Sequence, residues 1–303
     1  MVADCLDRAI LETLAYSAVF EYPLLLDELH RYLPVYAERD ALTIRLKSLM
    51  GPVGEKGGFY FLSGNDEFVH IRRQREARSR RLIPYALRYG RILGALPFVR
   101  MAALTGSLAV LNASQNADFD YMLVAASGRV WTARAFALLF NRLTRMRGYT
   151  LCPNLIVSEN ALAWSVRDAY SARELCQMIP VSGMDTYRKL MQANDWVKDF
   201  LPNAFREISA QWRKIERNEI SAVQRLLEPP LSGKSGDRLE RWEMRRKIAR
   251  LSKQDGFGEE TVFNAEICQG NFDHHRRRTK KMLEERLEPL RSAEERLEKV
   301  RTP

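Results

Sequence analysis

The chain is short of cysteine and of long apolar runs, and each shortage disfavours a class of protein. Four cysteines occur in 303 residues, and no two of them form a CxxC pair: Cys5, Cys152, Cys176 and Cys268. Zinc-ribbon and thioredoxin-like folds are therefore disfavoured, and scattered cysteines without a secretory signal predict reduced thiols in a cytoplasmic protein. No stretch approaches the ~20 apolar residues of a membrane span, so we expect no association with a membrane.

Acidic residues are also in deficit. The chain has 48 lysines and arginines against 38 aspartates and glutamates, which gives a formal charge of +10 and a pI of about 9.5. Such an excess favours polyanionic partners such as nucleotides or nucleic acid, although it also serves solubility alone. The hydrophobic share of 46% is ordinary for a folded protein, and the length allows two or three modest domains.

The first 70 residues predict three short helices followed by a hairpin. Apolar residues recur at helical spacing over 4–20, 24–33 and 38–50, and Gly57-Gly58 precedes a short apolar strand. This order is typical of a winged helix, whose third helix and hairpin tip face DNA when it binds DNA. The cations in those places are Arg39, Arg45, Lys47 and Lys56. Protein docking or a scaffolding role remains the alternative.

A strongly basic helix is predicted next, over 71–95. Its arginines fall at positions 72, 73, 75, 78, 80, 81, 88 and 91. Such a helix links two domains with its charges in water, or it neutralises phosphates in a salt-dependent manner.

Strands and helices alternate over 96–160. We expect strands at 99–105, 119–124 and 149–157, with a helix over 130–146. The remainder predicts a helical domain at 161–228, a linker at 229–237 and charged helices at 238–303. Within the last part, 266–270 is expected to end a packed helix at Gly270.

One constellation in the 96–160 region carries recognisable chemistry. Asp118 and Asp120 alternate along a strand, so their carboxylates point to one face and can share a metal ion. Gly106-Ser107 ends the preceding strand and begins a helix, where backbone N–H groups and a hydroxyl suit an anion. A glycine there leaves room for phosphate oxygens.

The spacing of these residues resembles the polymerase-beta-like nucleotidyltransferase superfamily, and more narrowly its bacterial members with an N-terminal winged helix. The family pattern is an apolar residue, Gly, and Gly or Ser, then about ten residues, then Asp, an apolar residue, and Asp or Glu. Here Thr105-Gly106-Ser107 is followed after ten residues by Asp118-Phe119-Asp120. The resemblance implies an α+β fold: a mixed sheet with helices, behind a winged helix and before a helical C-terminal region.

The resemblance also implies an activity and its site. Asp118 and Asp120 would be the catalytic residues and would bind Mg²⁺ or Mn²⁺, and an NMP would pass from an NTP to an unknown acceptor. Gly106 and Ser107 would hold the triphosphate, and Arg129, in the loop after the aspartate strand, is the best placed further phosphate contact.

Family enzymes usually place a third acid on the following strand, where Asn154 stands here as a candidate metal ligand. An amide brings no charge and cannot act as a base. The alternative is therefore a degenerate nucleotidyltransferase fold that senses nucleotide or binds nucleic acid.

Overall fold

The chain has an α+β fold, which confirms the fold class predicted from the sequence. A computed structural model describes residues 2–211 and 220–301. It contains a three-stranded antiparallel sheet near the N-terminus and a six-stranded mixed sheet in the larger part of the molecule. None of the helices in these two ranges has both the length and the apolar character that a membrane span requires.

The N-terminal part contains the three predicted helices and the predicted hairpin. The helices are α1 (Val2–Ala18), α2 (Leu26–Arg31) and α3 (Arg39–Ser48), and the strands are β1 (Leu24–Leu25), β2 (Val53–Lys56) and β3 (Phe59–Leu62), in the order β1-β3-β2. Residues Ile10, Leu14 and Leu42 are fully buried, as their helical spacing predicted. The apolar faces of the helices thus form a separate small core.

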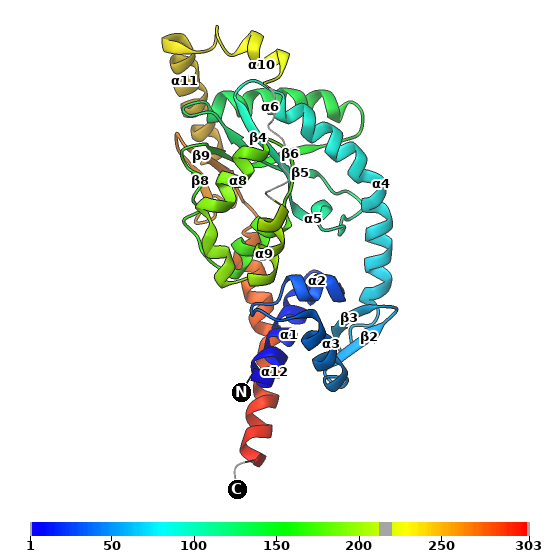
Figure 1. Cartoon of the computed structure of the whole chain (residues 1–303). Helices are drawn as coiled ribbons and strands as arrows, with labels where there is room; N and C mark the ends of the chain where they lie inside the picture. Colours follow the sequence, from blue (N-terminus) through cyan, green and yellow to red (C-terminus); the bar gives the residue numbers. More distant parts are fainter. Residues whose placement is uncertain (1, 212–219, 302–303) are drawn as a thin grey trace.

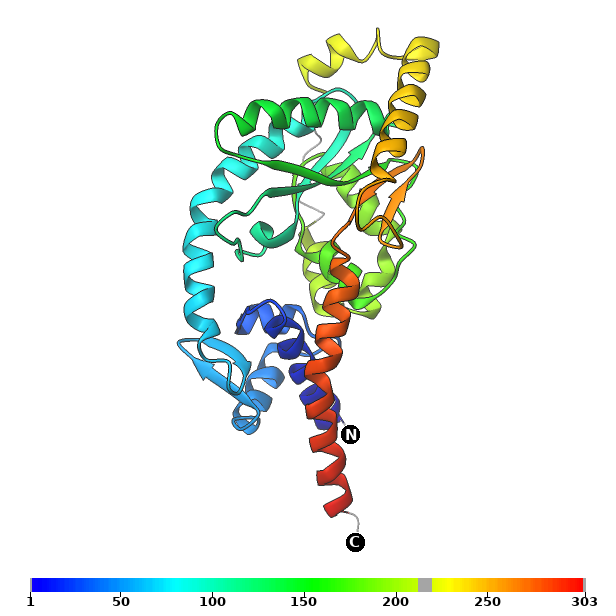
Figure 2. The same ribbon diagram turned by 180° about the vertical axis from the view of Figure 1, so that it is seen from behind.

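Helix α4 (Phe68–Gly94) is a single long helix that joins this part to the larger sheet (Figures 1 and 2). It includes the predicted basic linker. Several of its arginines point into the protein rather than into water. Arg75 donates to the Phe20 carbonyl at 3.0 Å and Arg78 to the Ala113 carbonyl at 3.0 Å.

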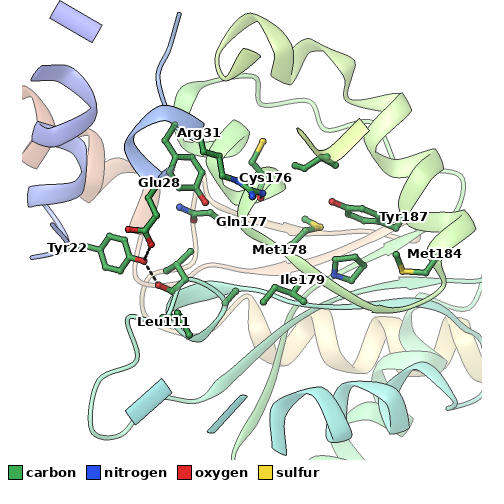
Figure 3. A pocket seen from close by; sticks show the side chains of 15 residues that line it. Tyr22, Glu28, Arg31, Leu111, Cys176, Gln177, Met178, Ile179, Met184 and Tyr187 are labelled. Atoms are coloured by element: carbon green, nitrogen blue, oxygen red, sulfur yellow. Dashed lines mark hydrogen bonds between the residues drawn. The ribbon is translucent and has the colours of Figure 1, made fainter. Parts of the chain in front are cut away.

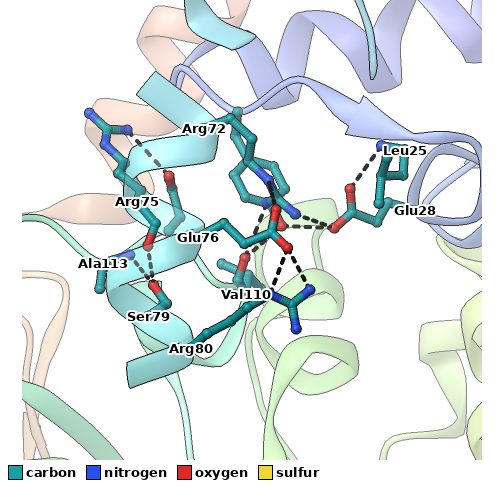
Figure 4. Close-up of polar contacts among 11 residues, drawn as sticks. Leu25, Glu28, Arg72, Arg75, Glu76, Ser79, Arg80, Val110 and Ala113 are labelled. Atoms are coloured by element: carbon teal, nitrogen blue, oxygen red, sulfur yellow. Dashed lines mark hydrogen bonds and ion pairs between the residues drawn. The ribbon is translucent and has the colours of Figure 1, made fainter. Parts of the chain in front are cut away.

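Arg72 is the most deeply buried of these arginines, with 1% of its surface exposed. Its guanidinium donates to Glu28 at 2.8 Å and to the Val110 carbonyl at 3.3 Å, and it lies over the Tyr22 ring at 3.7 Å. Tyr22 in turn donates to the Val110 carbonyl. Figure 4 shows the bonds of Arg72 to Glu28 and Val110. One buried network therefore connects the N-terminal part, α4 and the larger domain.

The larger sheet has the order β7-β4-β5-β6-β9-β8. Its strands are β4 (Val99–Leu104), β5 (Phe119–Ala125), β6 (Leu151–Ser158), β7 (Ile179–Ser182), β8 (Thr261–Phe263) and β9 (Ile267–Gly270). Only β5 and β6 run parallel, while the other pairs are antiparallel. The three strands predicted in the 96–160 region are thus the centre of a wider sheet.

Helices cover both faces of this sheet. One face packs against α4, α6 (Val130–Arg145) and α11 (Gly233–Leu251). The other packs against α7 (Ala169–Gln177), α8 (Met184–Ala193), the 3₁₀ helix η1 (Asp195–Asp199) and α9 (Pro202–Gln211). The short helix α5 (Gly106–Ala109) connects β4 with the segment before β5.

The C-terminal region differs from the prediction in one clear respect. Residues 266–270, expected to end a helix, form β9, in which Cys268 pairs with Ile156 of β6. A short apolar run does not distinguish a helix end from a strand, and the pairing partner lies far away in the sequence. Helix α11 starts inside the linker predicted at 229–237, and helix α10 (Ala222–Leu227) ends just before that linker. Helix α12 (His275–Arg301) packs beside α1. The predicted helical domain at 161–228 includes residues 212–219, which lie outside the described residues.

Candidate functional site

Two aspartates lie together at the start of the central strand. Asp120 is the second residue of β5, and Asp118 is exposed just before it. Both share the strand face of Met122 and Val124, which is covered by α7 and α8. Because β4 and β5 are antiparallel, the end of β4 meets this point, and the Thr105 N–H donates to the Asp120 carbonyl at 2.9 Å. The structure thus brings Gly106 next to Asp120, with Ser107 following in α5 and Asp118 just before β5.

Gly106 touches the Asp120 carboxylate directly. A Cβ atom at position 106 would overlap Asp120 Oδ2 and would lie 3.1 Å from its Cβ. The backbone at Gly106 has a φ of +66°, which also favours glycine. Beside it, the hydroxyl of Thr105 is buried and has no hydrogen-bond partner in the described part of the chain. The backbone, a carboxylate and an unpaired hydroxyl therefore converge at this turn.

If the turn at Gly106 holds a nucleotide, as the resemblance implies, replacing Gly106 by alanine should weaken that binding by more than tenfold. The added methyl group displaces the Asp120 carboxylate, in addition to a backbone strain of about 1–2 kcal/mol for a left-handed residue. Gly128→Ala is the matched control, because Gly128 has a φ of +65° and no atom within 4 Å of an added Cβ. Calorimetric titration with Mg·ATP would measure both variants. Equal losses in the two would show that backbone strain alone is responsible.

Burial changes the acidity of Asp120. It raises the pKa of that carboxyl to about 7; the charge of Asp118 adds to the rise, while a hydrogen bond from the Cys152 thiol opposes it. Near neutral pH Asp120 is therefore only partly ionised. A bound divalent cation would stabilise its ionised form, since an opposite charge favours the charged state of an acid.

The strand register corrects the predicted position of the third ligand. Cys152, and not Asn154, lies opposite Asp120 on β6. A bulge leaves Asn154 as an extra, exposed residue between the pairs of Pro153 and Leu155, so it stands beyond the level of the aspartates. Burial also raises the pKa of Cys152 to about 12, so the thiol stays neutral and donates to Asp120. No acid of β6 completes the site.

Arg129 is not part of this site, contrary to the prediction. It follows the far end of β5, and the five residues from Asp120 to Ala125 span about 17 Å at strand rise. Its guanidinium pairs with Asp237 at 2.8 Å and lies over the Phe98 ring. The loop after β5 is close to Asp120 in sequence but lies at the opposite end of the strand.

Glu174 of α7 is an acid that the sequence analysis missed. Glu174 belongs to the helix that covers the sheet face of Asp120, and burial, with a contribution from the charge of Asp120, raises the pKa of Glu174 to about 7. No local motif surrounds Glu174, and only the packing of α7 across the sheet places it here. Its pKa near neutrality makes it able to accept or release a proton.

The donor set fits Mg²⁺ when phosphate completes it. In the described part of the chain, no three His, Cys, Asp or Glu side chains are close enough together to hold a metal ion by themselves. Mg²⁺ is commonly held by one or two carboxylates together with water and substrate phosphates. Asp118 and Asp120 can supply that number of ligands.

A cavity of about 770 Å³ adjoins the site between the N-terminal part and the larger domain (Figure 3). Val110 and Leu111, which follow α5, form one wall, and Cys176 and Gln177 at the end of α7 form another. The cavity is therefore lined by residues of α5 and α7, the two helices that also lie next to the aspartate pair. Neither aspartate lines the cavity itself. Tyr22, Glu28, Arg31 and Tyr32 contribute its polar groups from the N-terminal part.

Comparison with known proteins adds no assignment, because no protein-family model, curated protein or solved structure matches this chain. The resemblance to nucleotidyltransferases therefore depends on residues 105–121.

Proposed function

We propose that the chain transfers a nucleoside monophosphate from an NTP to an acceptor, with Asp118 and Asp120 holding Mg²⁺ or Mn²⁺. The observation that carries this proposal is the direct contact of the Gly106 backbone with the Asp120 carboxylate. It puts the start of α5, where backbone N–H groups and the Ser107 hydroxyl suit phosphate oxygens, next to a metal-ligating carboxylate. This is the arrangement that phosphoryl chemistry needs, because positioning and charge neutralisation supply most of the catalysis.

Each group then has a role. A bound divalent ion neutralises the charge of the triphosphate. The turn at Gly106 and Ser107 orients the phosphates, and the unpaired Thr105 hydroxyl offers them a donor. An acceptor oxygen attacks the α-phosphorus, forming the new P–O bond as the bond to pyrophosphate breaks, and Glu174 takes the acceptor's proton. The adjoining cavity has room for the acceptor.

The double substitution Asp118→Ala/Asp120→Ala tests this function. We expect transfer of label from an α-labelled NTP to fall by at least about 100-fold, because the loss of metal neutralisation is worth several kcal/mol. The control variant Asp199→Ala/Asp255→Ala removes two exposed acids elsewhere and should keep full transfer. The assay needs each of the four NTPs, Mg²⁺ or Mn²⁺, and protein, RNA and small-molecule acceptors. Label transfer that survives in the double variant would overturn the proposal.

A second candidate is a nucleotide-binding regulator without transfer. Cys152 favours it, because a neutral thiol stands where family enzymes usually place a third acid. Melting curves with Mg·ATP separate the two candidates. A melting temperature that rises with nucleotide, in the absence of any transfer, would identify the regulator.

A further inference from the structure

Helix α11 presents a face of cations around an exposed tryptophan. Trp242 is 56% exposed, which is unusual for so large an apolar side chain. It lies in a hollow of about 530 Å³ that is otherwise lined by arginines only: Arg238, Arg241, Arg245 and Arg246. The Arg246 guanidinium lies over the Trp242 ring at 4.9 Å. Within the described ranges, Arg238, Arg241 and Arg245 make no hydrogen bond or ion pair with their side chains.

Each acid of α11 already has a partner within the protein. Buried Glu240 accepts the N–H groups of Trp131 and Thr132 at 2.7 Å each, and so caps the start of α6. Buried Glu243 pairs with Arg246 at 2.6 Å, and Asp237 pairs with Arg129. On the outward face Arg246 is therefore paired, whereas Arg238, Arg241 and Arg245 keep their positive charge without compensation.

The neighbouring helices extend this charge. Helix α6 packs beside α11 and contains no acid, and exposed arginines follow its last turns. Exposed arginines of this layer outside α11 include Arg81, Arg88, Arg91, Arg142, Arg145 and Arg147. The layer covers the sheet face opposite to Asp118 and Asp120, so this surface is distinct from the candidate site (Figures 1 and 2).

The cations first expected to meet DNA are, by contrast, mostly paired. In the N-terminal part Arg39 pairs with Asp27, Arg45 with Asp7 and Lys56 with Asp66. Their charges are neutralised within that part of the chain. Uncompensated arginines around an exposed aromatic ring are instead found on α11.

We propose that this face binds single-stranded nucleic acid, with an unpaired base stacked on Trp242 and phosphates on the flanking arginines. A groove of cations beside an aromatic ring is what such a strand requires, and base stacking needs bases that are not paired. An anionic membrane fits less well. A helix that lies in a membrane interface turns its apolar face to the lipid, whereas Met244, Ile248 and Leu251 of α11 pack into the core.

Fluorescence anisotropy with labelled 20-mers of RNA, of single-stranded DNA and of duplex DNA tests this inference on the full chain, without nucleotide or metal. We expect both single strands to bind more tightly than the duplex, and Trp242→Ala to weaken their binding about tenfold, since one stacked base is worth about 1–3 kcal/mol. Trp242→Phe should restore most of the affinity. Arg241→Gln/Arg245→Gln should reduce the slope of log K against log salt by roughly 1.4, for two lost phosphate contacts.

The matched control is Arg277→Gln/Arg278→Gln, which removes the same charge from exposed positions of α12. It should leave affinity and slope nearly unchanged. An equal loss in this control, a preference for the duplex, or an unchanged affinity in Trp242→Ala would overturn the inference. The inference would also be overturned if the chain bound phosphatidylserine vesicles in a Trp242-dependent manner but bound none of the nucleic acids. Because the assay omits nucleotide and metal, its outcome is independent of the proposed transfer reaction.

Discussion

Replacing Arg72 by alanine is expected to lower the free energy of unfolding by about 3–5 kcal/mol, because it breaks a buried ion pair and leaves the other charge alone. Arg72 donates to Glu28 at 2.8 Å and is almost entirely buried. The substitution also removes the contact with the Tyr22 ring at 3.7 Å. Burial lowers the pKa of Arg72 to about 10, so the guanidinium is still charged at neutral pH.

Urea denaturation at pH 7 would measure this loss, with Arg81→Ala as the control from an exposed position of the same helix. A further comparison isolates the charge. Arg72→Met/Glu28→Gln should recover a large part of the loss, because it leaves no unpaired charge and keeps most of the side-chain volume. A loss below about 1 kcal/mol in Arg72→Ala would contradict the account, since that is typical of an exposed pair.

The Arg72 network also bears on the candidate site. Both Arg72 and Tyr22 donate to the carbonyl of Val110, the residue directly after α5. Gly106 begins that helix, and four residues span about 6 Å at helical rise. The network therefore fixes the C-terminal end of α5, while Gly106 at the N-terminal end of α5 lies against Asp120. Residues of the network also form one wall of the adjoining cavity.

The parts that the sequence predicted well are those fixed by local patterns. Each helix of the N-terminal part was predicted from the helical spacing of apolar residues within its own segment. Gly106 lies next to Asp120 because β4 and β5 are adjacent antiparallel strands that follow each other in sequence, so the end of β4 lies beside the start of β5. In both cases the information is contained in a few consecutive residues.

The parts that the sequence did not predict depend on contacts between distant segments. The register of β6 against β5 places Cys152 opposite Asp120, and a bulge after Pro153 leaves Asn154 unpaired; neither feature can be read from spacing alone. Arg129 was assigned by its nearness in sequence, although a strand carries the chain to the other edge of the sheet. Glu174 reaches the site only because α7 packs across β5, and β9 is a strand only because β6 pairs with it.

Replacing Asp120 by asparagine is expected to stabilise the metal-free protein at pH 8 by up to about 4 kcal/mol. The folded protein raises the pKa of Asp120 from the ordinary 3.8 to about 7. Between those pH values the unfolded chain has already released its proton while the folded protein retains it. The free energy of unfolding therefore falls as the pH rises from about 4 to about 7, by 1.36 kcal/mol for each pH unit, and stays lowered above pH 7.

Urea denaturation at pH 4, 5.5, 7 and 8 in EDTA would measure this difference, with Asp199→Asn as the exposed control. Glu174 and other acids with a raised pKa contribute to the slope of every variant, so only the difference from the wild type reports on Asp120. Parallel curves for the wild type and Asp120→Asn would contradict the expected burial cost.

Addition of Mg·ATP should then reverse the order of stability. A cation bound by the ionised carboxylate favours the form that burial disfavours, so the wild type gains stability while Asp120→Asn gains little. The gain of the wild type should grow from pH 6 to pH 8, as Asp120 loses its proton more readily. An aspartate that lowers the free energy of unfolding without ligand, and raises it when Mg·ATP is bound, is what selection for ligand binding rather than for folding would maintain at position 120.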